Sequence, residues 1–252
     1  MTAPALLVRE VGYARRTLLR DPQSLFFTVG LPLLYLLIFD TVFGDQVGHI
    51  AGQPGIMKAS IPITASIIVI GVVSAAFQNL AISLVQDREN GVLKRLRSAP
   101  VPTWLFLGGQ LVNALLTALV IAVGVAGAGF VIYEVPLPGE RTAAAVVTVL
   151  VGTAACAGAA IPFTRLVTKA SAASPVTAAV SLTLFFISGS FFAGATMPRS
   201  MTFVADLFPV SHFTRAMTTA FNPNVTGAGF SPVELLILGA WAVGGSLVGL
   251  WV

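Results

Sequence analysis

Six long apolar segments, separated by short polar stretches, dominate the chain. Apolar residues run almost unbroken through each segment, and a helix of roughly 20 such residues crosses the hydrocarbon core of a bilayer. The pattern therefore predicts membrane-spanning helices rather than the amphipathic helices of a soluble domain. We expect these spans at about 23–43, 60–85, 103–132, 143–163, 173–193 and 232–252.

The composition indicates that lipid is the main solvent of these helices. Hydrophobic residues make up 56% of the 252 residues and charged residues only 10%, whereas a soluble domain keeps roughly a quarter of its residues charged. The 24 glycines and 15 prolines are tolerated inside membrane helices, where neighbouring groups satisfy the freed backbone. We predict an all-α integral membrane protein with a single transmembrane domain over 1–252.

Residues 5–20 precede the first span and have helical spacing of apolar positions. A second face of this helix is cationic and aromatic, with Arg9, Tyr13, Arg16 and Arg20. That pattern favours a helix lying in the membrane interface, with its arginines among anionic headgroups. The alternative is a solvated helix of a small cytosolic extension.

Lysines and arginines give the orientation of the spans. With the N-terminus inside, ten of these residues fall on cytoplasmic segments and four on outer segments. Cytoplasmic segments carry the excess of positive charge in membrane proteins. Both termini are therefore expected in the cytoplasm.

Motifs for catalysis, nucleotide binding and metal binding are missing from the sequence. None of the three lysines stands in a phosphate-binding G-x-x-x-x-G-K-[ST] loop. His49 and His212 are isolated, and Cys156 is the single cysteine, so a zinc site or an intramolecular disulfide is not expected. The serines at 188–190 lack a histidine at matching depth, which disfavours a membrane enzyme. A membrane-bound assembly scaffold is the other alternative to a transporter.

Ionisable residues are sparse within the spans. Asp40 and Glu234 lie near the outer ends of their helices, whereas ion-coupled transporters need ionisable groups near the middle of the bilayer. An ion-coupled secondary transporter or channel is thus an alternative that the sequence disfavours. The neutral polar residues of the second and third spans are more typical of hydrogen bonds between helices than of substrate contacts.

The most charged stretch of the chain is 86–101, between the second and third spans. Carboxylates lie near its beginning and cations near its end, as the helix dipole prefers. Leu93 and Leu96 make an apolar pair at helical spacing, and Pro100 ends the helix. We predict a short amphipathic helix on the cytoplasmic side. The alternative is a loop held at the headgroups.

Two stretches carry a resemblance to a known family. The first is the run Asp87-Arg88-Glu89-x-Gly91-x-Leu93-x-x-Leu96-x-x-x-Pro100. The second is Met197-Pro198 followed by Leu207-Phe208-Pro209-Val210-Ser211-His212-Phe213-Thr214-Arg215-Ala216. Together, on six spans, they resemble the ABC-2-type transporter permeases, the membrane subunits of many bacterial exporters of drugs, polysaccharides and lipids. The closest similarity is to the drug-resistance, daunorubicin-type permeases, and it covers essentially the whole chain.

The resemblance implies a role for each part. The loop at 86–101 is a coupling helix that docks on a separate ATPase subunit, and short outer helices after the fifth span dip back into the membrane. Two permease chains, identical or homologous, join two ATPase subunits in the bacterial plasma membrane. ATP and magnesium bind to the ATPase, so this chain needs no cofactor and is not itself an enzyme. The coupling residues implied are Asp87, Arg88, Glu89, Gly91, Leu93, Leu96 and Pro100.

The substrate implied is an amphipathic drug, antibiotic or lipid. Contacts with it are expected from the second and fifth spans, near the two-fold axis between the two permease chains. The residues expected there are Phe77, Asn79, Phe185 and Phe186. Aromatic residues at such positions more often pack in the core of a bundle, and this alternative stays open.

Overall fold

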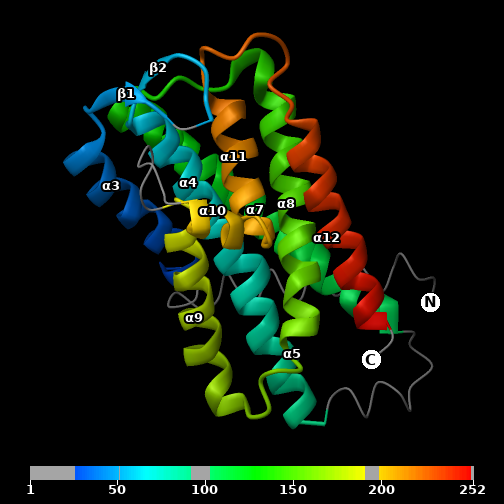
Figure 1. Ribbon diagram of the computed structural model, residues 1–252. Coiled ribbons are helices and arrows are strands. Elements are labelled where there is room, and N and C mark those ends of the chain that lie inside the picture. Colours follow the sequence, from blue (N-terminus) through cyan, green and yellow to red (C-terminus); the bar gives the residue numbers. More distant parts are fainter. Residues whose placement is uncertain (1–25, 51, 92–102, 191–198, 251–252) are drawn as a thin grey trace, which may run out of the picture.

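The computed structural model describes residues 26–50, 52–91, 103–190 and 199–250, and its helices form one elongated bundle (Figure 1). Two predicted segments lie wholly or partly outside these ranges. The predicted interfacial helix at 5–20 and positions 92–101 of the predicted coupling segment lie outside the described residues.

The first two predicted spans form helices that each include a π-helical turn. Their elements are η1 (Phe26–Gly30), α3 (Leu31–Phe43), α4 (Ser60–Val73), η2 (Ser74–Gln78) and α5 (Asn79–Glu89). The last three join into one helix of 30 residues. This helix continues past the expected end at 85, because glutamine, arginine and glutamate are good helix formers. Pro32 is the second residue of α3, which follows the π-helical turn η1 directly.

The remaining long helices follow the predicted spans closely. They are α7 (Thr103–Tyr133), α8 (Thr142–Phe163), preceded by the short turn η3 (Gly139–Arg141), α9 (Ala170–Ile187) and α12 (Pro232–Leu250). The fifth helix, α9, ends six residues before the expected 193. Gly189 has a φ of +76°, a left-handed conformation that commonly ends a helix.

Four helices within the described residues are long and apolar enough to cross a membrane. They are Ser60–Glu89, Leu107–Tyr133, Gly139–Phe163 and Ala170–Ile187. Shorter apolar helices cover Thr28–Phe43 and Pro232–Val248. The helices thus form the all-α membrane protein that the sequence predicts. The count of six spans stays a prediction.

The polar stretch between the first two predicted spans contains a small antiparallel hairpin. Its strands are β1 (Val47–His49) and β2 (Ile56–Lys58), with Gly48 opposite Met57. Met57 is buried, whereas both neighbours in β2 are exposed, so the strand has the period of two that lets one face pack inward. The hairpin closes one end of the bundle (Figure 1), which we call the hairpin end.

Two helices follow the fifth span, as expected for the outer segment. They are α10 (Arg199–Ala205) and α11 (Pro209–Phe221). α11 lies against α4, α8 and α12, and most of its residues are buried, including Phe213 and Met217. A short helix of mixed polarity is therefore part of the core rather than a surface loop.

The core of the bundle is centred on α4. All 14 residues of this helix are buried, and α3, α7, α8 and α11 pack around it. By contrast, α3, α7 and α12 turn large apolar side chains outward, among them Leu37, Val123 and Leu236. Outward apolar faces of this kind suit contact with lipid.

The pair α8 and α12 forms the most extensive helix contact among the described elements. Glycines allow this close approach. A Cβ on Gly245 would lie 2.2 Å from the carbonyl oxygen of Gly158, and a Cβ on Gly158 would lie 2.8 Å from the carbonyl oxygen of Trp241. Small residues commonly bring membrane helices together in this way, since backbone packing replaces the hydrophobic driving force.

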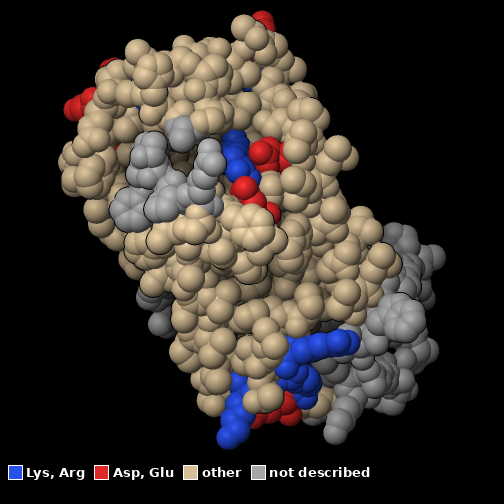
Figure 2. All heavy atoms as spheres, viewed as in Figure 1, with Lys and Arg blue, Asp and Glu red and all other residues tan. Residues whose placement is uncertain are grey.

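The end of the bundle opposite the hairpin carries a concentration of charge. Here α5 ends at Glu89, and the turn between α8 and α9 lies beside it (Figure 1). We call it the loop end. In Figure 2 most charged side chains of the viewed face gather at the loop end and in a second group near α11, with an uncharged surface between these two groups, and further acidic side chains lie toward the hairpin end.

Candidate functional site

Two adjacent residues at the end of α5 hold the connection between α8 and α9. The Arg88 guanidinium donates to the backbone oxygen of Thr164 at 3.1 Å and to that of Val167. The Glu89 carboxylate accepts from the backbone N–H of Ala170 at 2.5 Å. A cation thus meets backbone carbonyls that follow α8, and an anion meets a backbone amide at the start of α9, as both helix dipoles favour.

Gly91 ends the helix that contains these residues. Its N–H donates to the carbonyl of Arg88 at 3.2 Å, and its φ is +70°. A Cβ at Gly91 would meet no atom within 4 Å. Within the described structure, glycine is therefore needed for the left-handed backbone rather than for a close approach. Asp87 is half-buried beside Arg88, and the predicted contact residues Leu93, Leu96 and Pro100 lie outside the described residues.

The four predicted pathway residues divide into two buried and two exposed. Phe77 and Phe185 are buried, 6% and 5% exposed respectively. The Phe77 ring packs on that of Phe163, with 5.1 Å between their centroids. Asn79 and Phe186 are exposed on α5 and α9. Burial of Phe77 and Phe185 within the chain favours the packing alternative for these two, whereas Asn79 and Phe186 are accessible to a molecule outside the chain.

Asn79 belongs to a polar stripe along α5. Asn79 and Gln86 are exposed and Ser83 is half-buried, and their spacing of four and three residues places them on one helix face. The amide of Asn79, which lies within the expected span, would lack hydrogen-bond partners at a lipid surface, and this costs several kcal/mol. This face of α5 is therefore suited to another helix or to water.

The neighbouring helix α9 has an exposed face of mixed polarity. Its exposed hydroxyl residues are Ser171, Ser174 and Thr183. α7 has a different surface, since every exposed side chain from Val112 to Ile132 is apolar. The two helices α5 and α9 pack together. The contrast separates a polar side of the bundle, formed by α5 and α9, from a side suited to lipid.

A charged network joins α11 to α12 at the second group of charges. The His212 ring meets the Glu234 carboxylate, and Arg215 reaches Asp206 at 2.6 Å and Glu234 at 3.3 Å. The hydrogen bond to Glu234 raises the pKa of His212, while burial opposes the rise. His212 was isolated in the sequence because its partner Glu234 is 22 residues away. The network fixes α11 in its place within the core.

One family model accounts for this combination of helices and loop. A model described as ABC-2 type transporter matches residues 11–222. This chain belongs to the ABC-2 type transporter family. Among curated proteins, none matches it. The matched range includes the α5 end and both helices of the outer segment, and it stops before α12.

Membership establishes the general role of the chain. It is the permease component of an ABC transporter, a multi-pass membrane protein whose family works with an ABC ATPase. Within residues 26–50, 52–91, 103–190 and 199–250, no group of three or more histidine, cysteine or acidic side chains could hold a metal ion. This permease therefore has two candidate functional sites, the polar side formed by α5 and α9 and the contact that Arg88 and Glu89 make with the connection between α8 and α9.

Proposed function

We propose that this permease forms, with a second permease chain, the pathway of an ATP-driven exporter for an amphipathic substrate. The substrate class is a drug, an antibiotic or a lipid. The loop end faces the cytoplasm of a bacterium, both termini are cytoplasmic, and the chain lies in the plasma membrane. ATP and magnesium bind to the partner ATPase, and this chain neither binds nor hydrolyses nucleotide.

The observation that carries this proposal is the polar side of α5 and α9. The amide of Asn79 on α5 is exposed in the single chain, on the side of the bundle that α5 forms with the exposed hydroxyl groups of α9. An exposed amide is costly in hydrocarbon, so a second permease chain or a hydrated pathway is expected to cover it. Phe186 adds an exposed aromatic ring to α9. A face with both characters suits a molecule that has a polar and an apolar part.

Coupling follows from the contacts at the loop end. The segment that contains Leu93, Leu96 and Pro100 docks on the ATPase, and Asp87 and Gly91 set the direction in which the chain leaves α5. A displacement of this segment moves the end of α5. Because Arg88 and Glu89 hold the connection between α8 and α9, the displacement reaches α9. The pathway face on α9 is thus linked to the ATPase through two side chains.

Site-directed cysteine chemistry tests the pathway, in cells that also make the ATPase. The buried Cys156 is replaced by serine, and single cysteines are then introduced at two exposed positions. Ala178 is exposed near the middle of α9, on the polar side, and Val120 is exposed near the middle of α7. The two positions are thus matched in exposure and in their place along a helix.

We expect Ala178→Cys to react with a water-soluble maleimide or to form a disulfide with a second permease chain. A thiol that faces lipid meets neither the maleimide, because hydrocarbon excludes water and water-soluble molecules, nor the thiol of a second permease chain. Val120→Cys, the control, is therefore expected to do neither. Equal behaviour of the two positions would refute the assignment of the pathway to α9.

A further inference from the structure

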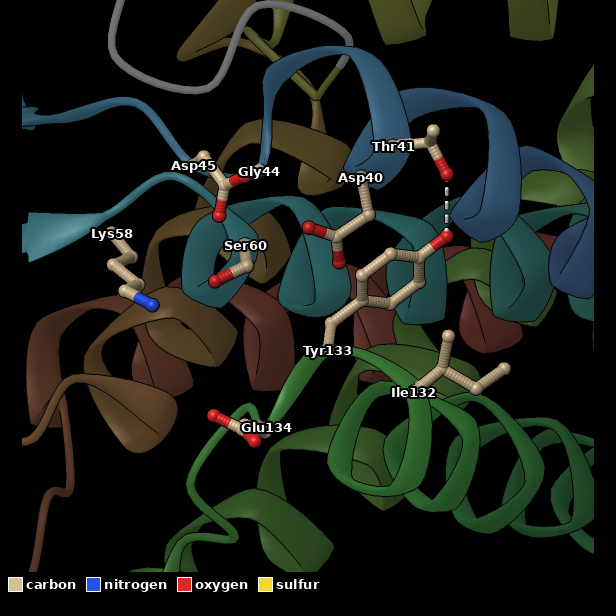
Figure 3. Close-up of a pocket in the computed structure, with 9 residues that line it drawn as sticks. All are labelled: Asp40, Thr41, Gly44, Asp45, Lys58, Ser60, Ile132, Tyr133 and Glu134. Carbon is tan, nitrogen blue, oxygen red and sulfur yellow. Dashed lines mark hydrogen bonds between the residues drawn. The ribbon is translucent and has the colours of Figure 1, made fainter.

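A pocket of about 370 Å³ lies at the hairpin end, between the end of α3, the start of α4 and the end of α7 (Figure 3). It is far along the bundle from the Arg88–Glu89 contact and belongs to neither part of the proposed transport site. Its lining is mostly polar, with Asp40, Thr41, Gly44, Asp45, Lys58, Ser60, Ile132, Tyr133 and Glu134.

Asp40 is the unusual member of this lining. The residue is 3% exposed, and neither carboxylate oxygen has a hydrogen-bond partner among the described residues. The side chain points into the space between α3, Ser60 and Tyr133 (Figure 3). A buried carboxylate without a partner is costly, so the position is explained if a ligand supplies the missing donor.

The neighbours of Asp40 hold the carboxylate in place but do not satisfy it. A Cβ on Gly44 would lie 1.9 Å from Asp40 Oδ1, so only glycine leaves room for the carboxylate there. The Tyr133 hydroxyl is 2.8 Å from Thr41 Oγ1 and donates to the carbonyl of Leu37 at 3.0 Å. Its single proton is therefore used by other groups.

The charge of the lining selects a cation. Asp45 and Glu134 add two exposed carboxylates to that of Asp40, and Lys58 is the one cationic side chain of the lining. The acidic groups do not form a cluster that could hold a metal ion within the described residues. An ammonium group fits better, because it has several N–H donors and meets carboxylates one at a time.

The surface beside the pocket is apolar. Ile132 lines the pocket and is 53% exposed, and Val131 and Leu37 continue the outward faces of α7 and α3. We propose that this pocket binds the protonated amine of an amphipathic molecule, whose apolar part lies along α3 and α7. The amine comes from a lipid headgroup or from a soluble amphipathic amine.

Native mass spectrometry of the full-length chain in detergent tests this site, with dodecylammonium as the probe. We expect the Asp40→Asn variant to bind dodecylammonium about tenfold more weakly than the wild type, because a charge-assisted hydrogen bond is lost. The matched control is Glu140→Gln, which removes a carboxylate from an exposed residue outside the pocket. Its affinity is expected to be unchanged, and the neutral probe dodecanol is expected not to distinguish Asp40→Asn from the wild type.

Equal binding of dodecylammonium by wild type and Asp40→Asn would overturn the proposal, as would an equal loss in Glu140→Gln. If Asp40→Asn fails to fold, the double variant Asp45→Asn, Glu134→Gln takes its place. Both residues are exposed at the rim, and their loss is expected to weaken binding about threefold or more. An unchanged affinity there would also overturn the proposal. Competition with phosphatidylethanolamine then separates the sources: displacement of the probe identifies a lipid headgroup, and its persistence identifies a soluble amine.

Discussion

The Glu89 carboxylate accepts a hydrogen bond from the Ala170 backbone amide across 81 positions of the sequence. This contact joins the end of α5 to the start of α9, which carries the exposed hydroxyl groups. Together with the hydrogen bonds from Arg88 to the carbonyls that follow α8, this contact connects α5, α8 and α9 at the loop end. Two residues of the stretch that resembles the coupling motif of ABC-2 permeases thus hold the connection between α8 and α9 of their own chain.

Replacing Glu89 by Lys should uncouple the pathway from the ATPase. A lysine cannot accept the Ala170 hydrogen bond, and its charge is unfavourable at the start of a helix. In membranes containing the permease and its ATPase, ATP is expected to change the maleimide reactivity of Ala178→Cys. The Glu89→Lys variant should lose this change while it reaches the membrane in normal amounts. Glu140→Lys, an exposed acidic residue near the other end of the bundle, serves as the control and should keep it.

Replacing Leu93 and Leu96 together by Asp should release the ATPase. Burying two leucines in an apolar recess contributes roughly 3–6 kcal/mol, and carboxylates in their place would oppose docking. We expect the variant to insert normally, to lose export and to lose the ATPase on co-purification. Retention of the ATPase with normal export would show that the docking segment is wrongly assigned. Loss of the permease from the membrane would indicate a structural role for the loop instead.

The glycine contact between α8 and α12 predicts a sharp difference between two glycines of one helix. A Cβ on Gly245 would lie 2.2 Å from a backbone oxygen, whereas a Cβ on Gly239 meets no atom within 4 Å. Gly245→Ala should therefore destabilise the chain by about 1–3 kcal/mol. Gly239→Ala should leave its stability unchanged or slightly higher. Thermal unfolding in detergent measures both, and similar melting of the two variants would contradict the packing described.

The network around His212 predicts a dependence of stability on pH. His212 faces Glu234 from α12, Arg215 from its own helix and the Asp206 carbonyl, and its pKa is raised above 6.5. Because the pKa of His212 is higher in the folded state, the protonated ring stabilises the fold fully below pH 6.5. This contribution is lost as the pH rises through the folded-state pKa. Melting temperatures between about pH 5.5 and 8.5 should fall for the wild type. They should fall less for His212→Gln, and identical slopes would contradict the prediction.

The helices were predictable from sequence because a run of about 20 apolar residues has few other solutions. Contacts between distant residues were not. Asp40 lies at the end of its span, as the sequence indicates, but its burial depends on Gly44 and on Tyr133 from another helix. The contact between His212 and Glu234 could not be predicted either, because the two residues come from different helices. For Phe77 the packing alternative describes its contact with Phe163, and no periodicity could have decided between packing and pathway.

The hairpin could not be predicted from the sequence for a different reason. Its strands have three residues each, which is too short for an alternating pattern to be recognised, and the sequence indicated only a polar stretch between two spans. Met57 faces inward only because the strand Val47–His49 pairs with it in the observed register. Local sequence therefore predicted a polar connection, and tertiary packing gave it a structure.

The π-helical turn Ser74–Gln78 sets the phase between the two halves of the second helix. A π turn contains one residue more than an α-helical turn, and each residue of an α-helix advances the side-chain direction by about 100°. Above this turn, α4 is buried on every side, and below it α5 presents the Asn79 stripe. Deleting Ala76 would restore the α-helical phase and rotate one half relative to the other. The stripe and the Glu89 carboxylate would then point in new directions, although every helix could still span the same thickness.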